Sequence, residues 1–175
     1  MATTYELIAS QVLGSDAATV TFSGIPGTYT DVVLVVSART TRASTVANSM
    51  FYFNGTASNL SQRILWAYTS SPASTTSLTD SALSFFTSGD TATASTFGNA
   101  EIYIPNYAGN ANKSVSWTAS YSANSASDYN YSNLVGAGLW SNTAAISSIT
   151  FGNRALDSAN YKSGSSFYLY GITKA

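Results

Sequence analysis

The sequence contains no histidine and no cysteine, and only 9% of its residues are charged, against about a quarter in an average soluble domain. Histidine is the commonest general base, and cysteine supplies the thiolate nucleophile. Without these two residue types a zinc, haem or iron–sulfur site is not expected, and a disulfide is excluded. We therefore expect a protein that is not an enzyme, with no catalytic residues, no metal and no cofactor.

Positive charge and long apolar runs are also scarce. Seven Lys and Arg residues stand against eight Asp and Glu residues, and only Arg39 and Arg42 lie close together in the sequence. A nucleic-acid binder needs a basic face that neutralises several phosphates, so we expect no nucleic-acid partner. No apolar run approaches the roughly 20 residues that cross a bilayer, and Glu6 interrupts the only early apolar stretch. We expect synthesis in the cytoplasm and no membrane partner.

Alternation of apolar and small polar residues dominates what is present. The segment Lys113–Ser122, KSVSWTASYS, places valine, tryptophan, alanine and tyrosine on one face and hydroxyl residues on the other. A period of two residues is typical of a half-buried strand. Similar candidate strands, separated by Gly, Pro and Asn turn signals, are Tyr5–Val12, Ala18–Phe22, Asp31–Arg39, Ser49–Phe53, Arg63–Thr69, Ala100–Ile104, Lys113–Ser122, Leu134–Ser141, Ala145–Phe151 and Phe167–Thr173. This pattern predicts an all-β, jelly-roll-like antiparallel β-sandwich that forms a single domain over residues 1–175.

Three segments depart from this simple pattern. Thr79–Thr87 fits a short helix capped by Thr79 or Asp80, although its two phenylalanines suit a strand equally well. Ser70–Asp80 and Ser122–Asn133 are rich in Ser, Thr and Asn, and we predict long surface loops there. Asp31–Arg39 is apolar on both faces, which predicts a strand in the middle of a layer or at a contact between subunits.

The candidate partner contacts lie in the second of these loops: Asp128, Tyr129, Asn130 and Tyr131. Tyrosine among small polar residues is typical of antibody contact loops, because tyrosine gives amphipathic contact area at low entropy cost. The alternative is a solvated loop whose tyrosines lie flat on the sandwich.

Other residues with chemical potential fit a structural role better. Glu101 in AEIYIP alternates with apolar neighbours and is predicted to point outward from a strand. Gly136 and Gly138 lack the third glycine of a dinucleotide fingerprint, and indicate a bulge or a close approach of backbone. The three tryptophans, at positions 66, 117 and 140, are predicted core residues, with a sugar-stacking platform as the alternative.

Several segments resemble small β-sandwich structural proteins of tailed bacteriophages. They are TYELIASQVL, FSGIPGTYTDVVLVVSAR (Phe22–Arg39), FYFNG (Phe51–Gly55), IYIPNYAG (Ile102–Gly109), AGLWSNTAAISSITF (Ala137–Phe151) and GSSFYLYGIT (Gly164–Thr173). The resemblance spans the chain and implies a component of the virion. Its motifs carry no catalytic residue.

The resemblance and the composition together favour a head decoration or cement protein that bridges capsomers on the outer surface of the capsid. Its expected partners are the major capsid protein and copies of itself, as a homotrimer. The alternative is a tail-fibre or spike domain that binds host surface glycan.

Overall fold

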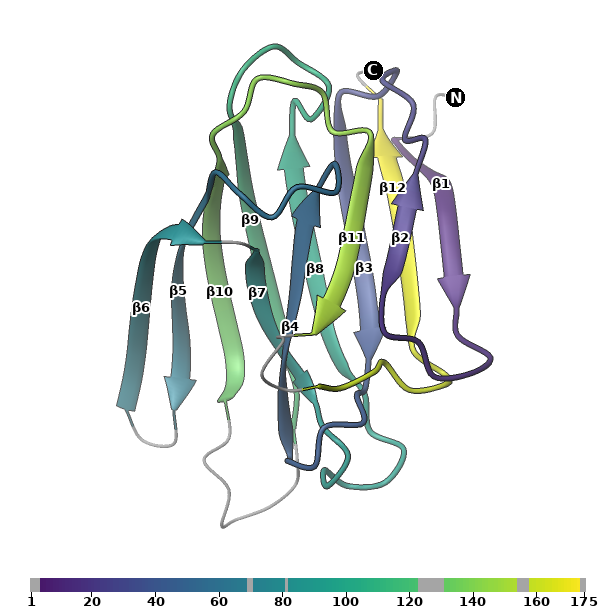
Figure 1. Ribbon diagram of the computed structural model, residues 1–175, viewed down its shortest axis with the longest axis vertical. Helices are drawn as coiled ribbons and strands as arrows, with labels where there is room; N and C mark the ends of the chain where they lie inside the picture. Colours follow the sequence, from purple (N-terminus) through teal and green to yellow (C-terminus); the bar gives the residue numbers. More distant parts are fainter. Residues whose placement is uncertain (1–3, 69–70, 81, 123–130, 154–157, 174–175) are drawn as a thin grey trace.

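Two antiparallel β-sheets pack against each other in a computed structural model of the chain (Figure 1). The structure describes residues 4–68, 71–80, 82–122, 131–153 and 158–173, and no helix occurs in these ranges. The strands of the larger sheet, in spatial order, are β1 (Tyr5–Val12), β12 (Ser166–Ile172), β3 (Asp31–Ala38), β8 (Gly98–Pro105), β9 (Lys113–Ser120), β10 (Tyr131–Trp140), β5 (Leu60–Tyr68) and β6 (Ser71–Asp80). Those of the smaller sheet are β2 (Val20–Ser23), β11 (Ser148–Asn153), β4 (Val46–Phe53) and β7 (Leu83–Ser88). The prediction of an all-β sandwich is confirmed.

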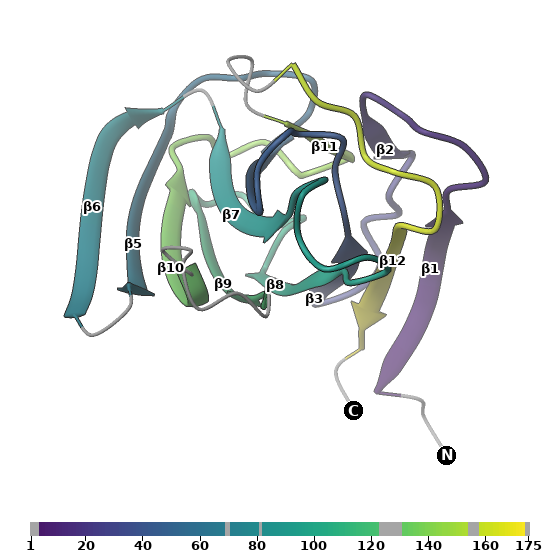
Figure 2. The ribbon, with the colours of Figure 1, turned by 90° about the horizontal axis from the view of Figure 1, so that it is seen from below.

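The chain crosses repeatedly between the two sheets. Strands β1, β2, β3 and β4 alternate between the larger and the smaller sheet, and so do β10, β11 and β12. Two antiparallel pairs, β5 with β6 and β9 with β10, widen the larger sheet at one end (Figure 2). The jelly-roll connectivity stays a prediction, with which these crossings are consistent.

The core lies between the sheets, where each strand turns every second side chain inward. Along β8 and β9, buried and exposed residues alternate almost without interruption, as the sequence pattern predicted. Phe51 lies among four other rings at centroid distances of 5.6 to 6.3 Å, those of Phe53, Phe85, Trp117 and Phe151. Aromatic packing of this kind replaces the disulfides that the chain cannot form.

Strand β3 lies inside the larger sheet between β12 and β8, as one of the two alternatives for Asp31–Arg39 predicted. Val32, Leu34 and Val36 point into the core and are almost completely buried. Val33 and Val35 point to the opposite face, where Val33 is covered and Val35 is exposed. The inner face of the strand is therefore apolar because it lies in the core. Its outer face is apolar because neighbouring side chains cover Val33 and because Val35 belongs to an exposed apolar surface.

One local prediction is wrong, and in a second segment the strand alternative holds in place of the helix. Ser71–Asp80 is not a loop but β6, the edge strand that pairs with β5. Serine and threonine hydroxyls can hydrogen-bond to water on an edge strand as well as in a loop. The polarity of the segment therefore did not distinguish a strand from a loop. Thr79–Thr87 does not form a helix, because Leu83 and Phe85 point into the core from β7 while β7 pairs with β4.

Candidate functional site

The predicted contact residues fall largely outside what the structure describes. Asp128, Tyr129 and Asn130 belong to residues 123–130, which are not described. Tyr131 is the first residue of β10, so the predicted loop over Ser122–Asn133 ends earlier than expected. The assignment of these four residues as partner contacts stays a prediction.

The outer face of the larger sheet, which is the face turned away from the smaller sheet, carries an unusual set of side chains. Among the side chains whose exposure the structure describes, every large hydrophobic one that is exposed points to this face: Tyr5, Leu7, Val12, Val35, Leu65, Tyr103, Val135 and Leu139. Val12 is 61% exposed and Leu65 is 53% exposed. Single exposed hydrophobic residues are normal, but a set confined to one face makes that face the candidate interaction surface.

These side chains form two groups. The first lies on β1, β3 and β8, and we call it the β1 patch: Tyr5, Leu7, Val12, Val35 and Tyr103. The second lies on β10 and β5, and we call it the β10 patch: Leu65, Val135 and Leu139. Strand β9 separates the patches with exposed hydroxyl residues at Ser114, Ser116 and Thr118. The outer face therefore offers two apolar surfaces, with a polar strip between them.

Tyrosines shape the β1 patch. Tyr168 and Tyr170 on β12 stack with ring centroids 6.4 Å apart, and Tyr170 pairs across the strands with Val33. On the other side of Val33, the Tyr103 hydroxyl donates a 2.8 Å hydrogen bond to Asp31 Oδ2. This bond to a carboxylate raises the pKa of Tyr103 and fixes its ring on the sheet.

A hollow of about 230 Å³ lies beside the β10 patch. Its lining is almost wholly apolar and consists of Leu65, Trp66, Ala67, Asn133, Leu134 and Val135. Trp66 is half-buried and packs edge-on against Phe86 at a centroid distance of 6.0 Å. Trp117 and Trp140 are buried, so the core prediction is confirmed for these two, whereas Trp66 lines a surface hollow.

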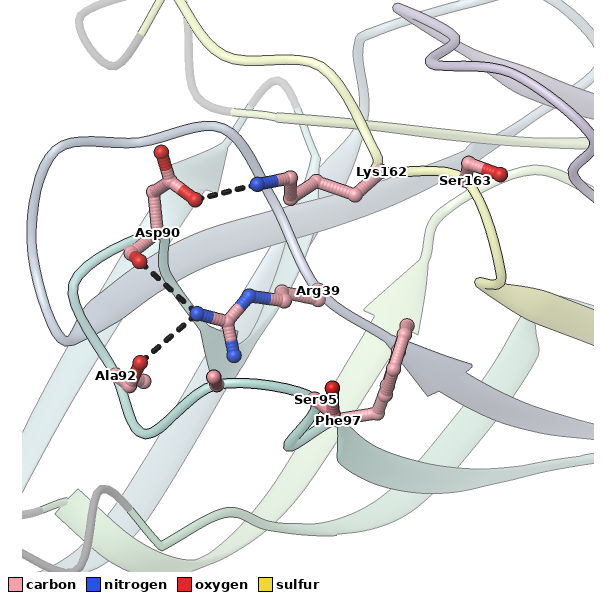
Figure 3. A pocket seen from close by; sticks show the side chains of 8 residues that line it. Arg39, Asp90, Ala92, Ser95, Phe97, Lys162 and Ser163 are labelled. Carbon is pink, nitrogen blue, oxygen red and sulfur yellow. Dashed lines mark hydrogen bonds and ion pairs between the residues drawn. The ribbon is translucent and has the colours of Figure 1, made fainter.

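A larger pocket, of about 390 Å³, lies at one end of the sandwich (Figure 3). Arg39 follows β3 and forms the inner wall of this pocket, with only 6% of its surface exposed. Its Nη1 donates to the carbonyl oxygens of Thr93 and Thr96, at 2.7 and 3.0 Å. Its Nη2 donates to the carbonyl oxygens of Asp90 and Ala92, at 2.9 and 2.8 Å.

These bonds tie the Arg39 guanidinium to the backbone of the loop from Asp90 to Thr96. Four carbonyl oxygens take up the N–H groups that would otherwise bind a carboxylate or a phosphate. At the rim, Lys162 Nζ lies 2.5 Å from Asp90 Oδ1, and this contact lowers the pKa of Asp90. Both cations of the pocket, Arg39 and Lys162, are therefore bound to groups of the chain itself. We interpret the pocket as the result of a stabilised loop and not as a ligand site.

Lys113 forms a second buried cation of the same kind at the start of β9. Its Nζ donates to the carbonyl oxygens of Gly109 and Ala111, at 2.7 and 2.5 Å. Burial lowers its pKa, as expected for a cation removed from water. Sequence reasoning missed both roles, because the carbonyl partners are independent of side-chain identity and leave no motif.

The acidic residues that the structure describes are scattered over strands and turns. Glu101 is exposed on β8, as predicted. Among the described residues, no three Asp or Glu side chains lie close enough to hold a metal ion. No helix of the described chain is long and apolar enough to span a membrane.

Consecutive apolar residues in the sequence indicate the apolar outer face. Strand β10 carries apolar residues at consecutive positions in LVGAGL, and β1 does so at Leu7 and Ile8, where strict alternation would place polar residues. Such runs predict a strand whose second face is also covered, either inside the protein or by a partner.

In comparison with known proteins, no family model matches this sequence and no curated protein matches it.

Proposed function

We propose that the protein is a non-enzymatic structural component of a bacteriophage virion, a decoration or cement protein that docks on the outer surface of the head and bridges capsomers. The observation that carries this proposal is the outer face of the larger sheet, which holds all the large hydrophobic side chains that the structure describes as exposed. A surface of this kind binds by burial of area and has no need of reactive groups.

The way in which the loops are held supports the same proposal. Arg39 and Lys113 clamp loops at the sandwich ends with bonds to backbone carbonyls, without metal or disulfide. A protein made in a reducing cytoplasm and then exposed on a particle needs this type of reinforcement. The resemblance of the sequence to tailed-phage virion proteins points to the same setting.

Copy number in the purified virion tests the proposal. A decoration protein occupies a repeating lattice, so quantitative mass spectrometry should find hundreds of copies per particle. A few copies, or a few dozen, would contradict head decoration and favour a tail fibre. Absence of the protein from the particle would contradict both.

We expect the β10 patch to contribute to docking on the major capsid protein. Replacing Leu65 and Val135 together with serine removes two exposed hydrophobic side chains and should weaken binding to undecorated heads by about tenfold or more. Thermal unfolding should change little, because both side chains are exposed. The control Met50→Ser changes a side chain on the smaller sheet and should bind normally. Normal binding by the double variant would contradict this role.

The hollow beside Trp66 favours a second candidate function, a fibre domain that holds host surface glycan. Tryptophan stacks on the apolar face of a sugar, and Asn133 supplies a polar group at the edge of the hollow. Titration of surface polysaccharide from the host, followed by tryptophan fluorescence, tests this candidate. A Trp66→Phe variant with unchanged binding would exclude the hollow as the site.

A further inference from the structure

The two sheets end in four edge strands, and three of these have features that hinder pairing with another chain. Strand β2 has only four residues, and β6 contains Pro72, which has no N–H group to donate. On β7, the Ser84 N–H donates to Gln62 Oε1, and the Ser84 carbonyl oxygen accepts from Trp117 Nε1. Side chains from the larger sheet thus bind the backbone N–H and carbonyl groups of Ser84 on β7.

The fourth edge strand, β1, carries one such feature, a bulge between Leu7 and Ala9, and no proline or described side chain blocks its backbone. It is eight residues long, contains no proline and no Lys or Arg, and pairs only with β12 within the described chain. Its side chains are exposed at both ends of the strand and on both faces. Tyr5, Leu7 and Val12 are each more than half exposed. An edge strand with these properties is a template for β-strand addition.

A bulge in β1 determines which of its residues share a face. The register with β12 shifts between Leu7 and Ala9, so Ile8 is an extra residue in the strand. In a regular strand, residues 5 and 12 would point to opposite faces. With the bulge, Tyr5 and Val12 both point to the outer face, whereas Glu6 and Gln11 both point to the inner face.

We propose that β1 pairs antiparallel with β1 of a second copy of this chain, about a two-fold axis between Ile8 and Ala9. In this register Tyr5 lies opposite Val12 of the second copy, and Glu6 lies opposite Gln11 of the second copy. The remaining pairs are Leu7 with Ser10 and Ile8 with Ala9. Each pair that flanks the bulge joins residues on the same face, which the strand achieves only because of its bulge.

The chemistry of these pairs favours a second copy over an unrelated strand. Glu6 is the only charged residue of β1, and the two-fold axis places an amide opposite it instead of another carboxylate. Tyrosine opposite valine is a favourable cross-strand pair. The larger sheets of the two copies become continuous, so their β1 patches lie side by side on one outer face. Bulges hinder addition to an edge, but here each bulge meets an identical bulge.

Substitutions of Gln11 by residues of opposite charge test the pairing of β1 with β1 of a second copy. Gln11→Glu creates a pair of like charges at both ends of the interface and should raise the dimer dissociation constant roughly fivefold. Gln11→Lys creates two Glu–Lys pairs and should lower the constant by a similar factor. Sedimentation of the full-length protein measures both. Ser114→Glu adds the same charge on β9 and should have no effect. Equal behaviour of the two Gln11 variants would overturn the proposal.

The absence of cysteine permits a direct test of register. A Leu7→Cys/Ser10→Cys variant should form a covalent dimer on mild oxidation, because each pair meets across the axis. Leu7→Cys/Val12→Cys is the misregistered control and should not. A dimer, or another even number of chains, supports the pairing, whereas a stable monomer or an isolated trimer overturns it. Virion copy number is measured separately, so the proposed function and this contact can fail independently.

Discussion

Arg39 and Lys113 are buried cations whose bonds go to backbone carbonyl oxygens instead of carboxylates. Each carbonyl oxygen carries a partial negative charge, and several together compensate a cation without a buried ion pair. The residues thus do the work that a bound metal ion or a disulfide does in other small domains. They lie at the start or end of strands, where each can reach a neighbouring loop.

Removal of the Arg39 side chain should expose how much this clamp contributes. Arg39→Met keeps the apolar stem but leaves four carbonyl oxygens without their donor, which should lower the free energy of unfolding by about 2 to 3 kcal/mol. Arg39→Lys keeps the charge but cannot span all four oxygens, so its loss should be intermediate. Urea unfolding measures both variants. Wild-type stability of the methionine variant would show that the loop stands without the clamp.

At the scale of elements, a glycine on β10 makes room for a tryptophan ring of the neighbouring strand β9. A Cβ atom at Gly136 would lie 2.0 Å from the Trp117 ring, a distance that no packing adjustment of a buried tryptophan absorbs cheaply. Gly138 leaves room in the same way for the Leu83 side chain, so the two glycines admit core side chains, and the pairing of β10 with β9 shows no bulge there. Gly171 has the same role beneath the ring of Tyr29, where a Cβ atom would lie 2.4 Å from the ring.

Gly136→Ala should lower the free energy of unfolding by about 1 to 3 kcal/mol, as expected for overpacking a core. Gly152→Ala on β11 is a matched control, because the nearest atom to its Cβ would be the Thr19 methyl group at 3.8 Å. The control should be neutral or slightly stabilising, since alanine restricts the unfolded chain. Thermal unfolding compares the two. Equal losses would indicate that strand flexibility, and not Trp117, requires the glycine.

Most strands could be predicted from the sequence because each buries every second side chain. Alternation is a local property, so β8 and β9 were visible directly in AEIYIP and KSVSWTAS. Strands β6 and β7 could not be separated from a loop and a helix, because β6 lies at a solvated edge and β7 depends on pairing with β4. The two outer-face patches depend on which strands become neighbours in the sheet. This strand order could not be predicted from the pattern of any single segment.

At the scale of the whole molecule, buried tyrosines determine the response to alkali. Burial raises the pKa of Tyr161, whose hydroxyl donates a 2.9 Å bond to the Gly152 carbonyl oxygen. Burial also raises the pKa of Tyr107. A tyrosine in the unfolded chain ionises near pH 10, whereas the raised pKa keeps these two neutral to a higher pH in the folded protein. Their stabilisation is therefore complete below pH 10 and is lost as the pH rises further.

We expect the free energy of unfolding to fall above pH 10, with each such tyrosine contributing a slope of up to about 1.4 kcal/mol per pH unit. Tyr161→Phe should remove one of these contributions. The variant should be less stable near neutral pH by about 1 kcal/mol, because it loses the bond to Gly152, but its alkaline slope should be shallower. Urea unfolding between pH 8 and 11.5 measures both. A slope equal to that of the wild type would show that Tyr161 ionises in the folded protein.

The carbonyl clamps also affect how the sequence can change over time. Every residue type presents the same backbone oxygen, so the loop that Arg39 holds, from Asp90 to Thr96, can exchange its side chains without loss of the bonds. These four bonds constrain only the path of the loop backbone and the arginine itself, whereas Asp90 is separately held by its ion pair with Lys162 and Ala92 by burial. The exposed positions of this loop can therefore change their side chains while the loop keeps its conformation.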